Sequence, residues 1–154
     1  MKKLTIIISL FFVFTYYGSA QKIDYFEIRD SLTFMTCGEI KLANIEKTIK
    51  NLESLDTTLL SNNIDAYYYD LGFCYGLYYQ YNKFEKYSFL SISSFKKAIQ
   101  HNPENPSAYT NLALSYYFLG DCTNCLLYLD LYKENIPEAN WDNEQLNSLY
   151  ELCK

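Results

Sequence analysis

Two cysteines that stand three residues apart are the side chains of this chain best suited to redox chemistry. Cys122-x-x-Cys125 opens a predicted helix, where the helix dipole and free backbone N–H groups lower the pKa of a thiol. The spacing is typical of a redox-active pair, but thioredoxin-type sites also need a strand before the helix, which the sequence does not predict here. Catalysis by the pair, a local or switchable disulfide, a structural disulfide and buried packing thiols therefore remain alternatives.

The other side chains that could do chemistry do not form a constellation. His101 is the single histidine, and no serine or cysteine partner can be identified for it. It lies near the end of a predicted helix, where an interaction with the helix dipole is the simpler explanation, and it is remote from the cysteine pair, which disfavours zinc. Asp65 and Asp70 diverge by about 140° on one predicted helix and are expected on solvated faces. We therefore expect no enzyme activity, no cofactor and no metal site.

The first twenty residues have the composition of an export signal. Lys2 and Lys3 form a charged start, residues 4–14 are almost entirely apolar, and small residues end the segment at Ala20. A secretory signal peptide has this build, and the apolar run is too short to span a bilayer comfortably. We expect residues 1–20 to be removed after Ala20, leaving a periplasmic or secreted protein without a membrane span. An uncleaved N-terminal anchor is the alternative.

The charge of the remaining chain argues against nucleic acid as a partner. Removing the signal leaves 134 of the 154 residues, with 11 basic against 18 acidic side chains and a net charge of −7. This length is enough for one domain with a hydrophobic core. No basic stripe offsets the negative charge, so contact with a phosphate backbone would begin with repulsion.

The clearest elements that would position these side chains are two helices in the C-terminal third of the chain. Asn105 can cap a helix whose first residue is Pro106, and Gly120 can end it in the left-handed conformation. Asp121 can cap a second helix over about residues 122–134. The apolar residues of the first helix fall on one face: Tyr109, Leu112, Ala113 and Tyr116. The stretch is therefore predicted to be a helical hairpin.

The preceding segment repeats this pattern with seven extra residues. The second-helix residues stand 34 positions apart in the two units, and the first-helix residues 41 apart: Ser91, Phe95, Ala98 and Pro103 match Cys125, Leu129, Tyr132 and Pro137, and Tyr68, Leu71, Gly72 and Tyr75 match Tyr109, Leu112, Ala113 and Tyr116. Seven residues is close to two helical turns, so one added turn in each helix keeps the faces in register. We therefore predict long helices over residues 65–81 and 83–100 with a turn at Asn82. A seven-residue loop is the alternative, disfavoured because Phe84 and Phe89 are apolar.

Further helices are predicted on either side of the two hairpins. Asn140 precedes a helix over residues 141–152. Before the hairpins, Thr36 and Glu39 form a capping box. The amphipathic helix behind it has its apolar residues every three or four positions: Leu42, Ile45, Ile49, Leu52 and Leu55. Another helix is predicted within residues 23–35.

The stretch over residues 106–137 resembles a tetratricopeptide repeat, a helical hairpin that stacks side by side with its neighbours. Tyr109 stands where the family often has tryptophan, and Tyr132 departs from the family, which usually has alanine there. The resemblance implies an all-α fold, a short right-handed stack of two repeats with N- and C-terminal capping helices. Because two repeats alone cannot bury a continuous core, we expect the caps in residues 21–64 and the repeats with the last cap in residues 65–154 to form one domain.

By this resemblance, one face of each first helix lines the inner, concave surface of the stack and binds other proteins. The residues expected there are Tyr69, Phe73, Leu77, Thr110, Leu114, Tyr117 and Phe118. Aromatic side chains offer a large contact area with little entropy to lose, which suits the recognition of a helical or extended apolar segment. None of the seven is basic, so the clamp with which the family binds a terminal carboxylate is not expected. Burial of this face by the N-terminal helices is the alternative.

The predicted stack also bears on the cysteines. The last helix should run antiparallel to the helix that begins at Cys122, which brings Cys153 close to Cys122 and Cys125. We therefore expect either a disulfide that involves Cys153 and pins the last helix, or buried thiols. Cys37 and Cys74 are expected to fill the core, with a bond between them as the alternative.

The expected function is that of an exported, non-enzymatic module that holds a segment of another protein on its aromatic inner face. One alternative is a small secreted inhibitor or immunity-type protein that blocks its partner with the acidic outer surface. The other is a thiol-disulfide protein that uses Cys122 and Cys125.

Overall fold

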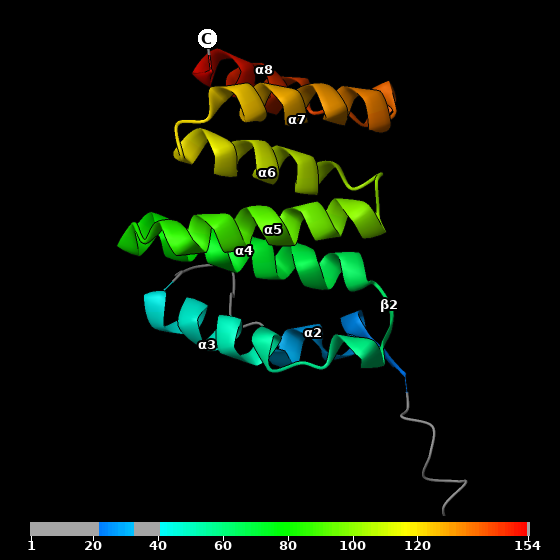
Figure 1. Ribbon diagram of the computed structural model, residues 1–154. Coiled ribbons are helices and arrows are strands. Elements are labelled where there is room, and N and C mark those ends of the chain that lie inside the picture. The colour runs from blue at the N-terminus through cyan, green and yellow to red at the C-terminus, as the bar shows by residue number, and fades with distance from the viewer. Residues whose placement is uncertain (1–21, 33–40, 154) are drawn as a thin grey trace, which may run out of the picture.

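Helices make up most of the computed structural model, which describes residues 22–32 and 41–153 (Figure 1). In this part of the chain seven α-helices follow one another: α2 (Tyr25–Leu32), α3 (Leu42–Glu53), α4 (Ile64–Asn82), α5 (Glu85–His101), α6 (Pro106–Phe118), α7 (Cys122–Asn135) and α8 (Asn143–Leu152). The prediction of an all-α fold is therefore confirmed. The predicted signal segment, residues 1–20, lies outside the described residues.

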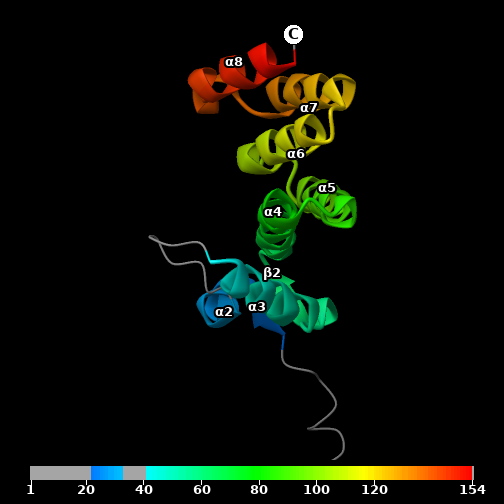
Figure 2. The ribbon, with the colours of Figure 1, turned by 90° about the vertical axis from the view of Figure 1, so that its left-hand side faces the viewer.

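The helices are stacked in chain order (Figure 1). At one end α2 and α3 lie together against α4, and the long helices α4 and α5 pack side by side as a hairpin. The next hairpin consists of α6 and α7, and α8 lies against both at the far end, as the view turned by 90° also shows (Figure 2).

The long hairpin has its turn where the sequence predicts it. Helix α4 ends at Asn82 and α5 begins at Glu85, so the seven extra residues lengthen the helices and do not form a loop. Lys83 adopts the left-handed conformation with φ of 60°, and the Asn82 side chain accepts a 2.9 Å hydrogen bond from the backbone N–H of Phe84. The predicted helix pair is therefore confirmed, with ends shifted by one or two residues.

The second hairpin has the predicted capping residues. The Asn105 side chain accepts a 3.1 Å hydrogen bond from the N–H of Ala108, and Pro106 is the first residue of α6. Gly120 has φ of 76°, a conformation that glycine adopts without steric cost. Asp121 caps α7 by accepting a 3.0 Å bond from the N–H of Asn124. These caps satisfy backbone donors that a helix leaves unpaired at its start.

The C-terminal helix begins at Asn143, two residues after the predicted start at Trp141. Residues Glu138–Asn140 form a 3-10 turn, and the indole N–H of Trp141 donates a 2.8 Å bond back to the carbonyl of Ile136. Asp142 then caps α8 by accepting a 2.9 Å bond from the N–H of Gln145. The bond from Trp141 keeps this residue out of the helix and leaves the capping position to the carboxylate of Asp142.

The N-terminal region contains a small element that the sequence does not predict. Two strands, β1 (Ile23–Asp24) and β2 (Leu60–Asn62), pair in parallel, and a 3-10 turn over Thr57–Leu59 precedes β2. The predicted helix within residues 23–35 is present but begins only after β1. The capping box of Thr36 and Glu39 lies outside the described residues.

Helices α4 and α5 approach each other closely at Gly72, where a side chain would not fit. A Cβ atom on Gly72 of α4 would lie 2.9 Å from the ring of Phe95 on α5. The hydroxyl of Ser91 on α5 also donates a 2.8 Å bond to the Gly72 carbonyl. Phe95 is buried with Ile92 and Leu112 in the cluster that joins the two hairpins. The close approach of α4 and α5 therefore depends on the missing side chain at Gly72.

Asp70 corrects the prediction that this residue lies on a solvated face, because only 3% of it is exposed. Its carboxylate accepts hydrogen bonds from the hydroxyl of Tyr25 at 2.8 Å and from the guanidinium of Arg29 at 2.6 and 2.7 Å. Both donors come from α2, which packs on this side of α4. Asp65, which is partly buried, instead accepts a 3.0 Å bond from the Asn102 side chain. The two carboxylates thus make separate contacts, Asp70 with α2 and Asp65 with the residue after α5.

Candidate functional site

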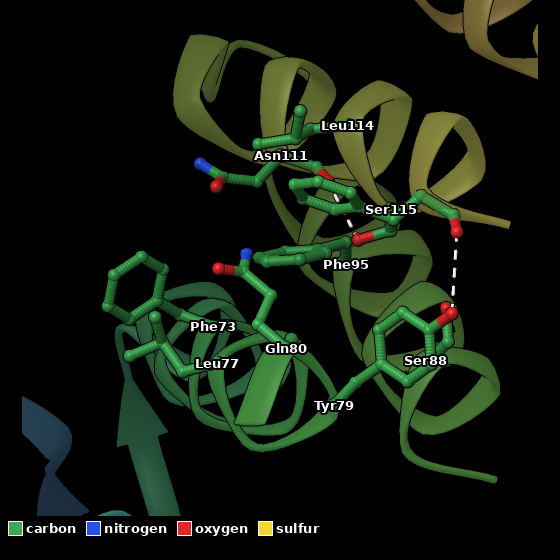
Figure 3. Close-up of a pocket in the computed structure, with 11 residues that line it drawn as sticks. Phe73, Leu77, Tyr79, Gln80, Ser88, Phe95, Asn111, Leu114 and Ser115 are labelled. Carbon is green, nitrogen blue, oxygen red and sulfur yellow. Dashed lines mark hydrogen bonds between the residues drawn. The ribbon is translucent and has the colours of Figure 1, made fainter. Parts of the chain in front are cut away.

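An open cavity of about 90 Å³ lies between α4, α5 and α6 (Figure 3). Four of the side chains predicted for the inner face line it: Phe73, Leu77, Leu114 and Phe118. Helix α4 contributes two of them and α6 the other two, so residues about forty positions apart in the sequence meet at one site. The cavity is therefore the candidate binding site.

Tyr69 lies next to the cavity but does not line it. Its ring is stacked with that of Phe73, with centroids 6.3 Å apart, and touches Phe95 at 5.7 Å. The Tyr69 hydroxyl accepts a 3.3 Å bond from the Asn111 side chain on α6. Burial raises the pKa of Tyr69, which keeps the hydroxyl protonated. Tyr69 thus supports the wall that Phe73 presents.

Two predicted residues of α6 do not belong to the cavity. Thr110 is only 4% exposed, and its hydroxyl donates weak bonds of 3.4 and 3.3 Å to carbonyls of its own helix, so the prediction that it contacts a partner is wrong. Tyr117 packs against the cluster under α7 and α8 and does not line the cavity. The reason is a rotation of α6 about its axis. Its residues at the cavity are Asn111, Leu114, Ser115 and Phe118, at i, i+3, i+4 and i+7.

Seven lining residues were not predicted from the sequence: Gly76, Tyr79, Gln80, Ser88, Phe95, Asn111 and Ser115. Phe95 is recognisable in the sequence as a packing residue of the repeated pattern, but nothing in the pattern shows that it also lines a cavity. Ser88 belongs to α5, the helix that lies behind the two predicted faces. The Tyr79 hydroxyl donates a 3.3 Å bond to the carbonyl of Phe118 and joins the two walls at one end.

The described N-terminal helices do not cover the cavity. Helix α3 meets α4 on another side, where the hydroxyl of Tyr67 donates to the carbonyl of Leu52 at 3.0 Å. On the same side the hydroxyl of Tyr78 donates to Glu46 at 2.7 Å. Every residue that lines the cavity belongs to α4, α5 or α6. The tyrosines of α4 thus have two roles. Tyr67 and Tyr78 pack against α3, whereas Tyr69 and Tyr79 lie beside or line the cavity.

The cavity wall is apolar with a few uncharged polar groups. Among the residues that the structure describes, no Lys, Arg, Asp or Glu side chain lines it, and the polar groups are the amides of Gln80 and Asn111 and the hydroxyls of Ser88, Ser115 and Tyr79. Such a wall has no charge with which to bind a phosphate or a carboxylate. It can instead enclose a small, mainly apolar group and offer it one or two hydrogen bonds.

Three cysteines meet at the far end of the stack, as the antiparallel arrangement predicts. Cys153, just after α8, lies close to both Cys122 and Cys125 at the start of α7, and all three are free thiols. The neighbouring Cys153 thiol raises the pKa of the Cys122 thiol, and burial raises the pKa of Cys125 and of Cys153. The expectation of a lowered thiol pKa is therefore wrong, because the thiols face one another and the core.

Of the two remaining cysteines, Cys37 and Cys74, the structure describes Cys74. Cys74 is fully buried in the cluster between α3 and α4, as expected of a core residue. Burial raises the pKa of its thiol to about 12, so the thiol is not activated. Cys37 lies outside the described residues.

Comparison with known proteins does not assign this chain to a family. No protein-family model, curated protein or solved structure matches it.

Within residues 22–32 and 41–153, no group of three or more His, Cys, Asp or Glu side chains is arranged to hold a metal ion. In that same part of the chain, no helix combines the length and the apolar character needed to cross a membrane.

Oxidation should link Cys153 to Cys122 or Cys125. Two thiols would give up two protons and two electrons to a disulfide reagent such as glutathione disulfide, which is reduced to two thiols. A bond that closes this loop should raise the free energy of unfolding by about 3 kcal/mol. Mass spectrometry of the alkylated, protease-digested protein would identify the linked peptides, and Cys153→Ser should abolish the added stability. A bond confined to Cys122 and Cys125, or three free thiols after treatment, would contradict the prediction.

Proposed function

We propose that the chain is an exported, non-enzymatic binding module that holds a segment of another protein in the cavity between α4 and α6. The helix pairs α4–α5 and α6–α7, the matched caps and the flanking helices support a stack of the tetratricopeptide-repeat type, right-handed, with residues 22–64 and α8 as its ends. The composition of residues 1–20 supports export to the periplasm or the medium, with cleavage after Ala20.

The observation that carries the proposal is an accessible apolar wall built from two helices. Phe118 is 41% exposed, and Phe73, Leu77 and Leu114 are half-buried around a cavity that no described residue fills. Exposed aromatic side chains around a pocket are typical of the anchor sites of protein interfaces. The absence of charged lining residues favours an apolar segment over an acidic or basic one.

The cysteines support a structural role better than catalysis. A catalytic thiol needs a lowered pKa, whereas the pKa of each of the three clustered thiols is raised. We therefore assign the cluster to holding α8 in place.

A charge placed on the cavity wall should abolish partner binding. The partner would be captured by a photo-reactive residue at Leu77, purified, and titrated against variants by calorimetry. Phe118→Glu should weaken binding at least about 30-fold, because a carboxylate cannot be desolvated against the apolar segment. Leu127→Glu is the matched control, because Leu127 on α7 is 48% exposed but remote from the cavity. Tyr69→Ala and Phe73→Ala should weaken binding as well.

Salt separates this proposal from a blocking role of the acidic surface. Binding in an uncharged cavity should change little between low and high ionic strength, whereas binding through net charge should collapse. Equal losses for Phe118→Glu and Leu127→Glu, or binding that disappears at high salt, would refute the proposal.

A further inference from the structure

One hydroxyl at the cavity is buried without a hydrogen bond. Ser88 on α5 is 1% exposed and lines the cavity, and its Oγ has no hydrogen-bond partner among the described residues. Its two serine neighbours differ: Ser91 donates to the Gly72 carbonyl at 2.8 Å, and Ser115 donates to the Asn111 carbonyl at 2.8 Å. A buried hydroxyl without a partner is costly, so a bound group that accepts its proton recovers the lost free energy.

The volume of the cavity limits what can enter. An engineered apolar cavity of about 150 Å³ holds benzene, which corresponds to about 25 Å³ for each carbon atom. At that density a cavity of about 90 Å³ takes about four heavy atoms. Leucine, isoleucine and methionine side chains have this size, whereas the rings of tryptophan and tyrosine are larger and would extend out of the cavity.

The walls favour sulfur among these side chains. Phenyl rings from three helices line the cavity: Phe73 on α4, Phe95 on α5 and Phe118 on α6. Figure 3 labels the first two. A thioether interacts favourably with aromatic rings and bends to fit an irregular space. Its sulfur also accepts a weak hydrogen bond, which no aliphatic carbon does.

We propose that the cavity anchors a methionine side chain of the partner segment, with the sulfur among the three phenyl rings and within reach of the Ser88 hydroxyl. This inference rests on the proposed function, because it names the residue by which the bound segment is held. According to this inference, the Ser88 hydroxyl is the group that makes a methionine side chain bind more tightly than a leucine side chain.

Two small probes test the inference without the partner. N-acetyl-methionine methylamide and its norleucine analogue have the same number of heavy atoms and differ only in sulfur against methylene. NMR titration should show millimolar binding of both at Phe73, Phe95 and Leu114. Methionine should bind about threefold more tightly, although norleucine is the more easily transferred out of water.

Ser88→Ala is the decisive variant, because it removes the hydroxyl without leaving a polar group unpaired. It should erase or reverse the preference for methionine, and it should raise the melting temperature by about 4 °C because an unpaired buried hydroxyl is lost. Norleucine binding as tightly as methionine in the unchanged protein, or an unchanged preference in Ser88→Ala, would overturn the inference. A leucine or tryptophan probe that binds more tightly would overturn it as well.

The two proposals fail separately. If the partner is lost in Phe118→Glu but the probes show no preference for sulfur, only the methionine anchor is refuted. If the methionine probe binds in the cavity but the captured partner is insensitive to Phe118→Glu, the proposed function is refuted and the cavity remains a site for a small thioether.

Discussion

Arg29→Ala should lower the free energy of unfolding by about 3 kcal/mol, although part of the Arg29 side chain is exposed. Its guanidinium makes two hydrogen bonds of 2.6 and 2.7 Å to the carboxylate of Asp70, which is nearly fully buried. Without Arg29, the bond from the Tyr25 hydroxyl is the one that this carboxylate keeps within the described part of the chain. A buried charge that has lost its partner costs more than the pair itself contributes, so the effect exceeds that of an ordinary surface ion pair.

Urea denaturation followed by circular dichroism would measure the effect. Glu27→Ala is the matched control, because Glu27 is an exposed charged residue of the same helix, and it should change stability by less than about 0.5 kcal/mol. The triple variant Tyr25→Phe, Arg29→Met and Asp70→Leu should recover most of the loss, because neither a charge nor an unpaired hydroxyl is then left buried. A loss in Arg29→Ala no larger than that in Glu27→Ala would show that Asp70 does not depend on the ion pair.

Raising the pH from 9 to 12 should remove on the order of 3 kcal/mol of stability through Cys74 alone. Burial, with a smaller contribution from the charge of Asp70, raises the pKa of this thiol from 9.0 to about 12. Above pH 9 the unfolded chain loses the thiol proton while the folded chain keeps it. The unfolded state then binds fewer protons, so stability is full below pH 9 and falls until the folded thiol also ionises.

Ionisation of Tyr67 also lowers the free energy of unfolding as the pH rises. Burial raises the pKa of its hydroxyl to about 12, so its contribution falls between pH 10 and 12. Chemical denaturation at several pH values would give the dependence of the free energy of unfolding on pH. Cys74→Ala should have a shallower alkaline decline than the unchanged protein, even if it is less stable at neutral pH. Parallel curves for the two proteins would contradict the assignment to Cys74.

The helix boundaries from α4 to α7 could be predicted within a residue or two. Caps such as Asn105 and Asp121, and the left-handed Gly120, act on backbone groups only two to four residues away, so the sequence alone contains the information. The start of α8 could not be predicted, because it depends on a bond from the Trp141 indole back to Ile136. The candidate site was predicted in part: α4 and α6 supply Phe73, Leu77, Leu114 and Phe118 as expected.

The amino-acid sequence by itself determined the helices from α4 to α7 and their lengths, because helical periodicity and capping are local. Only the tertiary structure decided that Asp70 is buried against α2, that Ser88 and Phe95 of α5 complete the cavity, and that Thr110 is turned away from it. These outcomes depend on how helices far apart in the sequence approach and rotate against one another. That rotation is set by side-chain packing across the whole stack, such as the contact of Phe95 with the bare backbone of Gly72.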